Sequence, residues 1–141
     1  MVAPVAPLKT VERALTAAIV ALAVAIGALH FSLDYVLYRG YFFFSTLSRL
    51  FVLNTAVFIL LAGLVVIGLR APLLWRVLLD VVLFFCAADT ILGWVYLRMA
   101  NPRGLGHFAV ALEAALIAAV VAHVLLLERG MWRAMAVQRR R

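Results

Sequence analysis

The chain has little charge and almost no cysteine. Only 13% of its 141 residues are charged, whereas 68% are hydrophobic; an ordinary soluble domain is about 25% charged. So few polar side chains cannot cover the surface of a globule of this size, which argues against an ordinary soluble domain and favours a bilayer as the solvent. The single cysteine, Cys86, excludes an intramolecular disulfide and any metal cluster built on several cysteines.

Long apolar runs dominate what is present. Four of them, at residues 14–33, 50–69, 77–97 and 105–127, are bounded by charges, and each is close to the about 20 residues that a helix needs to cross hydrocarbon. The first is longer than the about 7–15 apolar residues of a signal peptide, so we expect a span that is not cleaved. Spanning segments must be helical because lipid offers the backbone no hydrogen-bond partner. The sequence therefore predicts an all-α fold over residues 1–141, a single transmembrane domain with four helices in a bundle and a basic tail at 128–141.

The basic residues predict how this bundle is oriented. With four spans, both termini lie on the same side as the loop around Pro72. That side holds nine of the thirteen basic residues: Lys9, Arg13, Arg70, Arg76, Arg129, Arg133, Arg139, Arg140 and Arg141. The other side holds Arg39, Arg49, Arg98 and Arg103. By the positive-inside rule we expect a multi-pass protein of the inner or plasma membrane with both termini in the cytoplasm.

The net charge of +7 suggests an anionic partner. Because the basic residues flank the apolar runs, anionic headgroups explain them better than nucleic acid does. We expect membrane lipids as partners, with the tail arginines on the headgroups: Arg129, Arg133, Arg139, Arg140 and Arg141.

Two further patterns concern contacts with protein or lipid. The segment "DYVLYRGYFFFSTLSR" between the first two runs is aromatic; it is either an interfacial strip or a docking surface for another membrane protein. The first and fourth runs carry alanines at spacings of three and four, which we expect to be close-packing faces between helices. These alanines are Ala17, Ala21, Ala25 and Ala28 in the first run and Ala111, Ala115, Ala118 and Ala122 in the fourth.

The few polar residues inside the runs can be placed by depth, since a helix rises 1.5 Å per residue. In an antiparallel hairpin of the third and fourth runs, Asp80 and His123 lie at one depth on the inner side. Asp89 and Glu113 lie at another depth, within about 5 Å of the membrane centre, and we expect them to face each other. Asp80 and Asp89 are nine residues apart, half a turn out of phase, so both can face the fourth run only if the helix kinks or wraps.

The same depth argument pairs His30 of the first run with Asn54 of the second, toward the outer side. Asp34 follows His30 by four residues, on the same helical face, where it could orient the imidazole. His30, Asp89 and Glu113 are also candidate metal ligands, because a histidine with two carboxylates suits zinc, iron or manganese.

Three interpretations of the buried acids stay open. Two adjacent carboxylates in a low dielectric cannot both stay ionised, so an Asp89–Glu113 pair would hold a proton or a cation. Intramembrane acids are functional by default, which favours a proton or ion site, or ligand binding. The alternative is a hydrogen bond that only joins helices.

Other chemistry is less well supported by the sequence. A haem held by two histidines of this chain is disfavoured because His30 and His123 fall in opposite leaflets, about 20 Å apart in depth. A metal, quinone or haem at an interface with another subunit stays open. There is no nucleophile with a positioned base and no glycine-rich phosphate loop, so we do not expect an enzyme.

Four short motifs carry a resemblance. A histidine stands late in the first run (His30), "LFVLN" opens the second (residues 50–54), "WVYLR" closes the third (94–98), and Glu113 follows "GLGH" in the fourth. This arrangement resembles a group of uncharacterised small prokaryotic four-helix integral membrane proteins. The resemblance implies the four-helix membrane fold and no particular activity.

The sequence leaves two functional hypotheses. The first is an accessory or structural subunit of a larger membrane complex, such as one of electron transport, because the chain has no extramembrane domain, an aromatic outer segment and a basic tail. The alternative is a small membrane transporter, or a protein that binds metal, quinone or protons at a buried cluster of acids and histidine.

Overall fold

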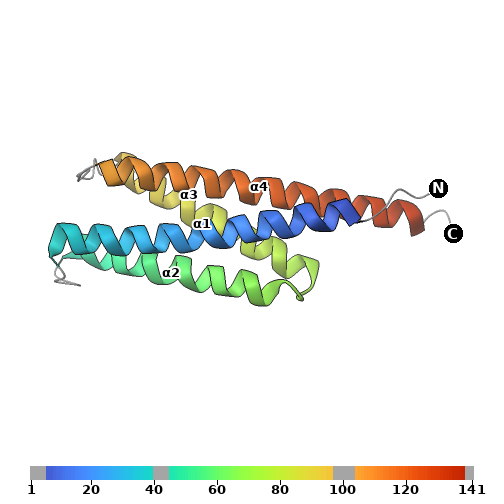
Figure 1. The fold of residues 1–141 in the computed structure, drawn as a ribbon, viewed down its shortest axis with the longest axis horizontal. Coiled ribbons are helices and arrows are strands. Elements are labelled where there is room, and N and C mark those ends of the chain that lie inside the picture. The colour runs from blue at the N-terminus through green and yellow to red at the C-terminus, as the bar shows by residue number, and fades with distance from the viewer. Residues whose placement is uncertain (1–5, 40–44, 97–103, 139–141) are drawn as a thin grey trace.

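The computed structural model describes residues 6–39, 45–96 and 104–138. They form four α-helices: α1 (Ala6–Tyr38), α2 (Thr46–Gly68), α3 (Leu73–Tyr96) and α4 (Leu105–Gln138) (Figure 1). Each helix is long and apolar enough to cross a membrane. The predicted all-α fold with four apolar helices is confirmed.

The first and last helices extend well past the predicted runs. They have 33 and 34 residues, so each is roughly 50 Å long, against about 30 Å of hydrocarbon in a bilayer. The start of α1 and the end of α4 lie at the same end of the bundle (Figure 1), here called the terminal end. The predicted basic tail at 128–141 begins within α4, which continues unbroken from the apolar run to Gln138.

Local signals explain where the helices begin and end. The Ser45 hydroxyl caps α2 by accepting a hydrogen bond from the Ser48 amide at 3.1 Å, which satisfies one of the free donors at a helix start. Arg39, directly after α1, has a φ of 50°, the left-handed geometry that commonly ends a helix. Pro72 directly precedes α3, where its missing amide removes no helical hydrogen bond.

Of the four contacts between neighbouring helices, three are close. α1 lies against α2 and α4, and α3 lies against α4, whereas α2 and α3 approach each other least. The α1–α2 contact depends on Gly27, since a Cβ atom there would lie 3.1 Å from the Ile59 side chain and 3.3 Å from the Thr55 carbonyl. Across the same contact the Thr55 hydroxyl donates to the Gly27 carbonyl at 3.1 Å.

The expectation that the alanine stripes form packing faces is wrong. All eight of those alanines are exposed except Ala25, which is half-buried. Larger side chains and polar groups at spacings of three and four form the buried face of α1: Thr16, Ile19, Ala23, Ile26, His30 and Leu33. In a helix this rich in alanine, alanines fall on every face, so spacing alone does not identify the buried one.

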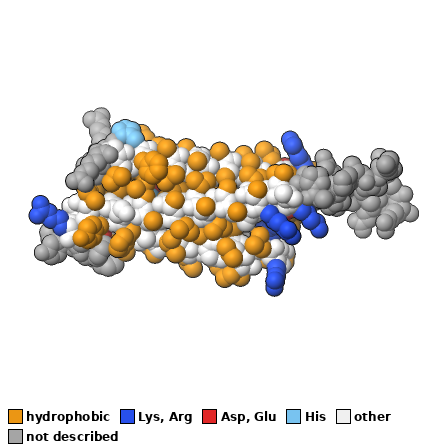
Figure 2. Space-filling view, viewed as in Figure 1, with side chains coloured by type: hydrophobic (Ala, Val, Ile, Leu, Met, Phe, Trp, Pro, Cys, Tyr) orange, Lys and Arg blue, Asp and Glu red, His pale blue; other side chains and the backbone are white. Residues whose placement is uncertain are grey.

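The surface between the two ends is apolar. Hydrophobic side chains cover the length of the bundle on the face drawn in Figure 2, and Lys and Arg side chains gather near the terminal end. An exposed hydrophobic surface that runs the length of the molecule is unusual for a monomer in water. The distribution fits a bundle whose middle faces hydrocarbon.

Candidate functional site

Two groups of buried polar side chains lie inside the bundle at different heights. Thr16 belongs to the one nearer the terminal end and His30 to the other. His30 comes fourteen positions after Thr16 in α1, roughly 21 Å along the helix. The space between is filled by a continuous apolar core that includes Ile19, Phe58 and Leu116. The two groups are therefore separate centres.

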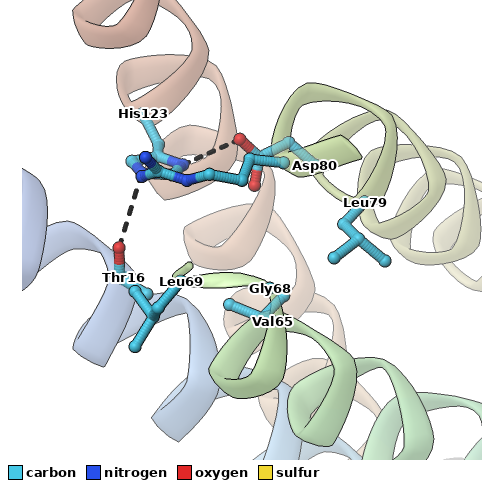
Figure 3. Close-up of a pocket in the computed structure, with 8 residues that line it drawn as sticks. Thr16, Val65, Gly68, Leu69, Leu79, Asp80 and His123 are labelled. Atoms are coloured by element: carbon cyan, nitrogen blue, oxygen red, sulfur yellow. Dashed lines mark hydrogen bonds and ion pairs between the residues drawn. The ribbon is translucent and has the colours of Figure 1, made fainter. Parts of the chain in front are cut away.

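The first centre is the Asp80–His123 pair. The His123 Nδ1 atom lies 2.7 Å from Asp80 Oδ2 (Figure 3), and the two residues are 3% and 1% exposed. This is the pair that depth matching predicts between the third and fourth apolar runs, and the contact is confirmed. Since a carboxylate only accepts, the short contact requires one proton between the imidazole and the carboxyl.

Thr16 completes this centre from α1. Its Oγ1 atom lies 3.4 Å from His123 Nε2, on the other edge of the ring from Asp80 (Figure 3). The same hydroxyl donates to the Glu12 carbonyl at 2.9 Å, so its single proton has two acceptors within reach. The sequence does not single out Thr16, because a threonine that bonds to the carbonyl four residues back is ordinary in a helix. The sequence feature that could have identified Thr16 is its depth in the first apolar run, which agrees with that of His123 in the fourth.

Arg76 borders the centre on the side of the terminal end. Its guanidinium forms an ion pair with the Glu12 carboxylate, and both side chains are half-buried. Together with Thr16, Asp80 and His123 it lines a cavity of about 10 Å³, which is near the space that a single water molecule requires. From the sequence alone, Arg76 is predicted only to flank an apolar run.

The second centre is the His30–Glu113 pair, which joins α1 to α4. Glu113 Oε1 lies 3.6 Å from His30 Nε2, and both side chains are fully buried. His30 Nδ1 lies 2.9 Å from the Ile26 carbonyl. Because a carbonyl can only accept, Nδ1 carries a proton, and in a neutral imidazole Nε2 is then an acceptor. Nε2 and a carboxylate would present lone pairs to each other, so the pair is complementary only when it holds one further proton.

Several polar atoms around this pair have no hydrogen-bond partner among the described residues. Six buried side-chain atoms are of this kind, and they belong to four residues: His30, Asp34, Trp94 and Glu113. The Phe51 ring lies beside two of these residues, with ring centroids 5.9 Å from His30 and 6.1 Å from Trp94. Buried polar groups are nearly always paired, so this half of the bundle carries unmet hydrogen-bonding capacity.

The predicted contact between Asp89 and Glu113 is wrong. Asp89 is exposed on the outer face of α3, whereas Glu113 is buried and faces His30. The reason is the phase of α3: Asp80 points into the bundle, and a residue nine positions later points the opposite way on a straight helix. The three candidate metal ligands His30, Asp89 and Glu113 therefore do not converge. Among the described residues no group of three His, Cys, Asp or Glu side chains is placed to hold a metal ion.

Two other predicted partners of His30 are also wrong. His30 Nδ1 bonds to the Ile26 carbonyl, and Nε2 has no hydrogen bond within the described residues, so neither Asn54 nor Asp34 binds the ring. Asn54 is half-buried on α2. Asp34 is fully buried but does not orient the imidazole, because the backbone carbonyl one turn back already occupies Nδ1.

The tail residues predicted to meet lipid headgroups are only partly described. Arg129 is exposed on α4, and Arg133 lies in the same helix. Arg139, Arg140 and Arg141 lie outside the described residues, as do the aromatic residues 41–44 and the end of the "WVYLR" motif.

Comparison with known proteins gives no match, whether to a protein-family model, a curated protein or a solved structure.

Proposed function

We propose that this chain is a small integral membrane protein that takes up and releases a proton on the His30–Glu113 pair, as a step in moving protons or cations across the membrane. One observation supports this most directly. The Ile26 carbonyl fixes the proton on His30 Nδ1, so Nε2 and the Glu113 carboxyl need a shared proton to be compatible. Both side chains are fully buried, which shields the proton from bulk water.

The surroundings of the pair support a route toward the end of the bundle opposite the terminal end. Asp34 follows His30 by one helical turn in that direction and is buried without a hydrogen bond to the described residues. Trp94, near the end of α3, has a buried ring N–H in the same condition. Acids and histidines in series are the usual components of proton relays in membranes.

The substitution Glu113→Gln tests the proposal. Glutamine has nearly the same size and can donate an amide proton to His30 Nε2, but it cannot release that proton. In proteoliposomes with an imposed membrane potential, we expect proton flux at least about tenfold lower than in the unchanged protein. The pH-dependent C=O stretch of the protonated carboxyl, followed by infrared difference spectroscopy, should disappear.

Glu128→Gln is the matched control, because it makes the same change on α4 at an exposed carboxylate that accepts from Trp132 Nε1. Flux and the infrared band should be unchanged in this variant. The proposal is wrong if the unchanged protein conducts no faster than empty liposomes and Glu113→Gln leaves the infrared spectrum as it was.

A specific observation also favours the accessory-subunit hypothesis as a second candidate. Asp89 is exposed near the middle of α3, where an acid facing hydrocarbon costs about 2.5–3.5 kcal/mol. It belongs to an exposed row at spacings of four and three residues, the pattern of a helix-pairing seam. The row is Leu78, Val82, Phe85, Asp89 and Leu92. We infer that another membrane subunit covers this face, within an assembly such as one of electron transport.

Site-specific photocrosslinking from native membranes tests this second candidate. A photoreactive residue at Phe85, which is 65% exposed, should join the chain to one other membrane protein in stoichiometric yield, whereas Leu60 of α2, 62% exposed, serves as the control. Equal, low crosslinking at both positions would leave Asp89 facing lipid and would contradict the subunit hypothesis.

A further inference from the structure

A groove opens beside the Asp80–His123 centre, at the surface formed by α1, the end of α2 and the start of α3. Its volume is about 830 Å³, within the roughly 300–1,000 Å³ of sites that hold small molecules. Val20, Val66 and Leu69 are among its apolar walls. Apolar walls of this kind suit an acyl chain, and the bilayer supplies acyl chains at high concentration.

The chemistry of the groove changes toward the terminal end. Lys9, Arg13 and Arg76 line it there, against one carboxylate, Glu12, which is paired with Arg76. Lys9 and Arg13 are exposed, and they leave the rim positively charged. An apolar wall with a cationic rim is complementary to an anionic phospholipid, its headgroup at the rim and its chain along the wall.

Thr16 lies where this groove meets the buried centre. It lines both the groove and the 10 Å³ cavity, as do Leu69 and Arg76. Thr16 follows Arg13 by three residues, roughly 4.5 Å deeper along the helix. A lipid whose headgroup is held by Arg13 would therefore place the bonds that join its headgroup region to its acyl chains close to the Thr16 hydroxyl.

Thr16, His123 and Asp80 follow one another in the order found in hydrolases that form a covalent intermediate. Its hydroxyl faces His123 Nε2 at 3.4 Å, and His123 Nδ1 faces Asp80 at 2.7 Å (Figure 3). A nucleophile, a base and an acid that orients the base define such sites on unrelated folds. The hydroxyl–imidazole distance is longer than a tight hydrogen bond, as it commonly is before a substrate binds.

We propose that Thr16, His123 and Asp80 form an acyl-transfer site that hydrolyses an ester of an anionic lipid. Asp80 accepts a hydrogen bond from Nδ1–H of His123, which holds the tautomer in which Nε2 has a free lone pair and can act as the base. Thr16 Oγ1 attacks the ester carbonyl carbon while its proton passes to Nε2, and the guanidinium of Arg76 stabilises the developing oxyanion. The ester C–O bond breaks, and the alcohol leaves with the proton from Nε2.

Water completes the cycle. It attacks the acyl-threonine carbonyl, gives one proton to Nε2, and the acid departs as Thr16 Oγ1 takes that proton back. The net reaction converts one ester and one water into one carboxylic acid and one alcohol, with no oxidation. The cavity beside Thr16 has room for about one water molecule.

The test uses the full chain in vesicles of phosphatidylglycerol with a labelled acyl chain, and it measures labelled fatty acid release. Thr16→Ala should lower the rate at least about 100-fold, and Thr16→Ser should retain most of it because the hydroxyl remains. Thr90→Ala is the matched control: Thr90 donates to the Cys86 carbonyl at 2.8 Å, the same bond four residues back. This variant should hydrolyse normally.

Three further measurements test catalysis against a structural role, test the basic rim, and add a surface control. Mass spectrometry of the quenched unchanged protein should find an acyl group on the Thr16 peptide, a signal that a structural role would not give. Lys9→Gln with Arg13→Gln should raise KM for phosphatidylglycerol and leave kcat within about twofold. Glu128→Gln, the change at an exposed carboxylate of α4, should hydrolyse at the unchanged rate. Fatty acid release is measured apart from proton flux, so failure of one proposal leaves the other standing.

Two results would overturn the acyl-transfer proposal. One is fatty acid release by the unchanged protein no faster than by Thr16→Ala, with both folded by circular dichroism and gel filtration. The other is release without any acylated Thr16 when turnover is quenched. Equal KM for phosphatidylglycerol and phosphatidylcholine would overturn the assignment of an anionic headgroup.

Discussion

The two buried histidines differ in what their ring nitrogens contact. Both nitrogens of His123 face side chains, Asp80 on one edge and Thr16 on the other, so the ring can exchange a proton with each. One nitrogen of His30 donates a hydrogen bond to a backbone carbonyl. A carbonyl oxygen neither takes up nor releases a proton at physiological pH. His30 therefore holds one exchangeable proton toward Glu113, whereas His123 links two titratable or reactive groups.

Breaking the buried Asp80–His123 contact should weaken the fold. Asp80→Ala removes the partner of His123 Nδ1 inside the bundle, and interhelical hydrogen bonds of this kind contribute about 1–2 kcal/mol in membranes. We expect the free energy of unfolding, measured by titration with a denaturing detergent, to fall by about this amount. Asp89→Ala, the same change on the exposed face of α3, should alter it much less, and equal losses would mean that the buried contact does not stabilise the bundle.

At the scale of helices, the α1–α2 contact should be the least tolerant of added volume. Gly27→Val would place carbon atoms against the Ile59 side chain and the Thr55 carbonyl, and overpacking typically costs about 1–3 kcal/mol. Gly63→Val is the control, since no heavy atom of the described residues lies within 4 Å of a Cβ at that position. Both substitutions carry the same helix propensity, so the difference in unfolding free energy measures packing alone. A difference near zero would contradict the close approach of α1 and α2.

The helices show which features can be read from the sequence. Charges and prolines delimit four apolar runs, because hydrocarbon sets the length of a span, and four helices follow. Depth within a hairpin predicted the Asp80–His123 contact, since consecutive antiparallel helices share a register. It could not predict His30 with Glu113, because these residues lie on α1 and α4, whose adjacency depends on how the two hairpins assemble.

Rotation of a helix about its axis was the other quantity that the sequence did not supply. Asp89 was matched in depth with Glu113 but lies on the outer face, since Asp80 already fixes which face of α3 is buried. The same uncertainty affected the alanine stripes of α1 and α4. Pairing by depth needs a second condition, namely the phase of each helix relative to a residue known to be buried.

At the scale of the whole molecule, the two centres divide the bundle into unlike halves. The half near the terminal end combines a basic rim, an apolar groove and the Thr16–His123–Asp80 set. The other half holds the enclosed His30–Glu113 pair, and the buried Asp34 and Trp94 atoms that have no hydrogen-bond partner among the described residues. In a membrane the two halves would lie in different leaflets. The lipid hydrolysis proposal concerns the leaflet at the terminal end, and the proton proposal concerns exchange toward the opposite leaflet.

The sides can be assigned by cysteine labelling in whole cells. In a Cys86→Ala background, Pro72→Cys lies between α2 and α3 near the terminal end and Thr46→Cys lies at the start of α2 at the opposite end; both positions are exposed. The nine basic residues of the terminal side predict that it is cytoplasmic. A membrane-impermeant maleimide should therefore label Thr46→Cys in intact cells and Pro72→Cys only after permeabilisation. The cysteine-free protein should stay unlabelled in both conditions, and the reverse pattern would place the basic groove on the outer leaflet.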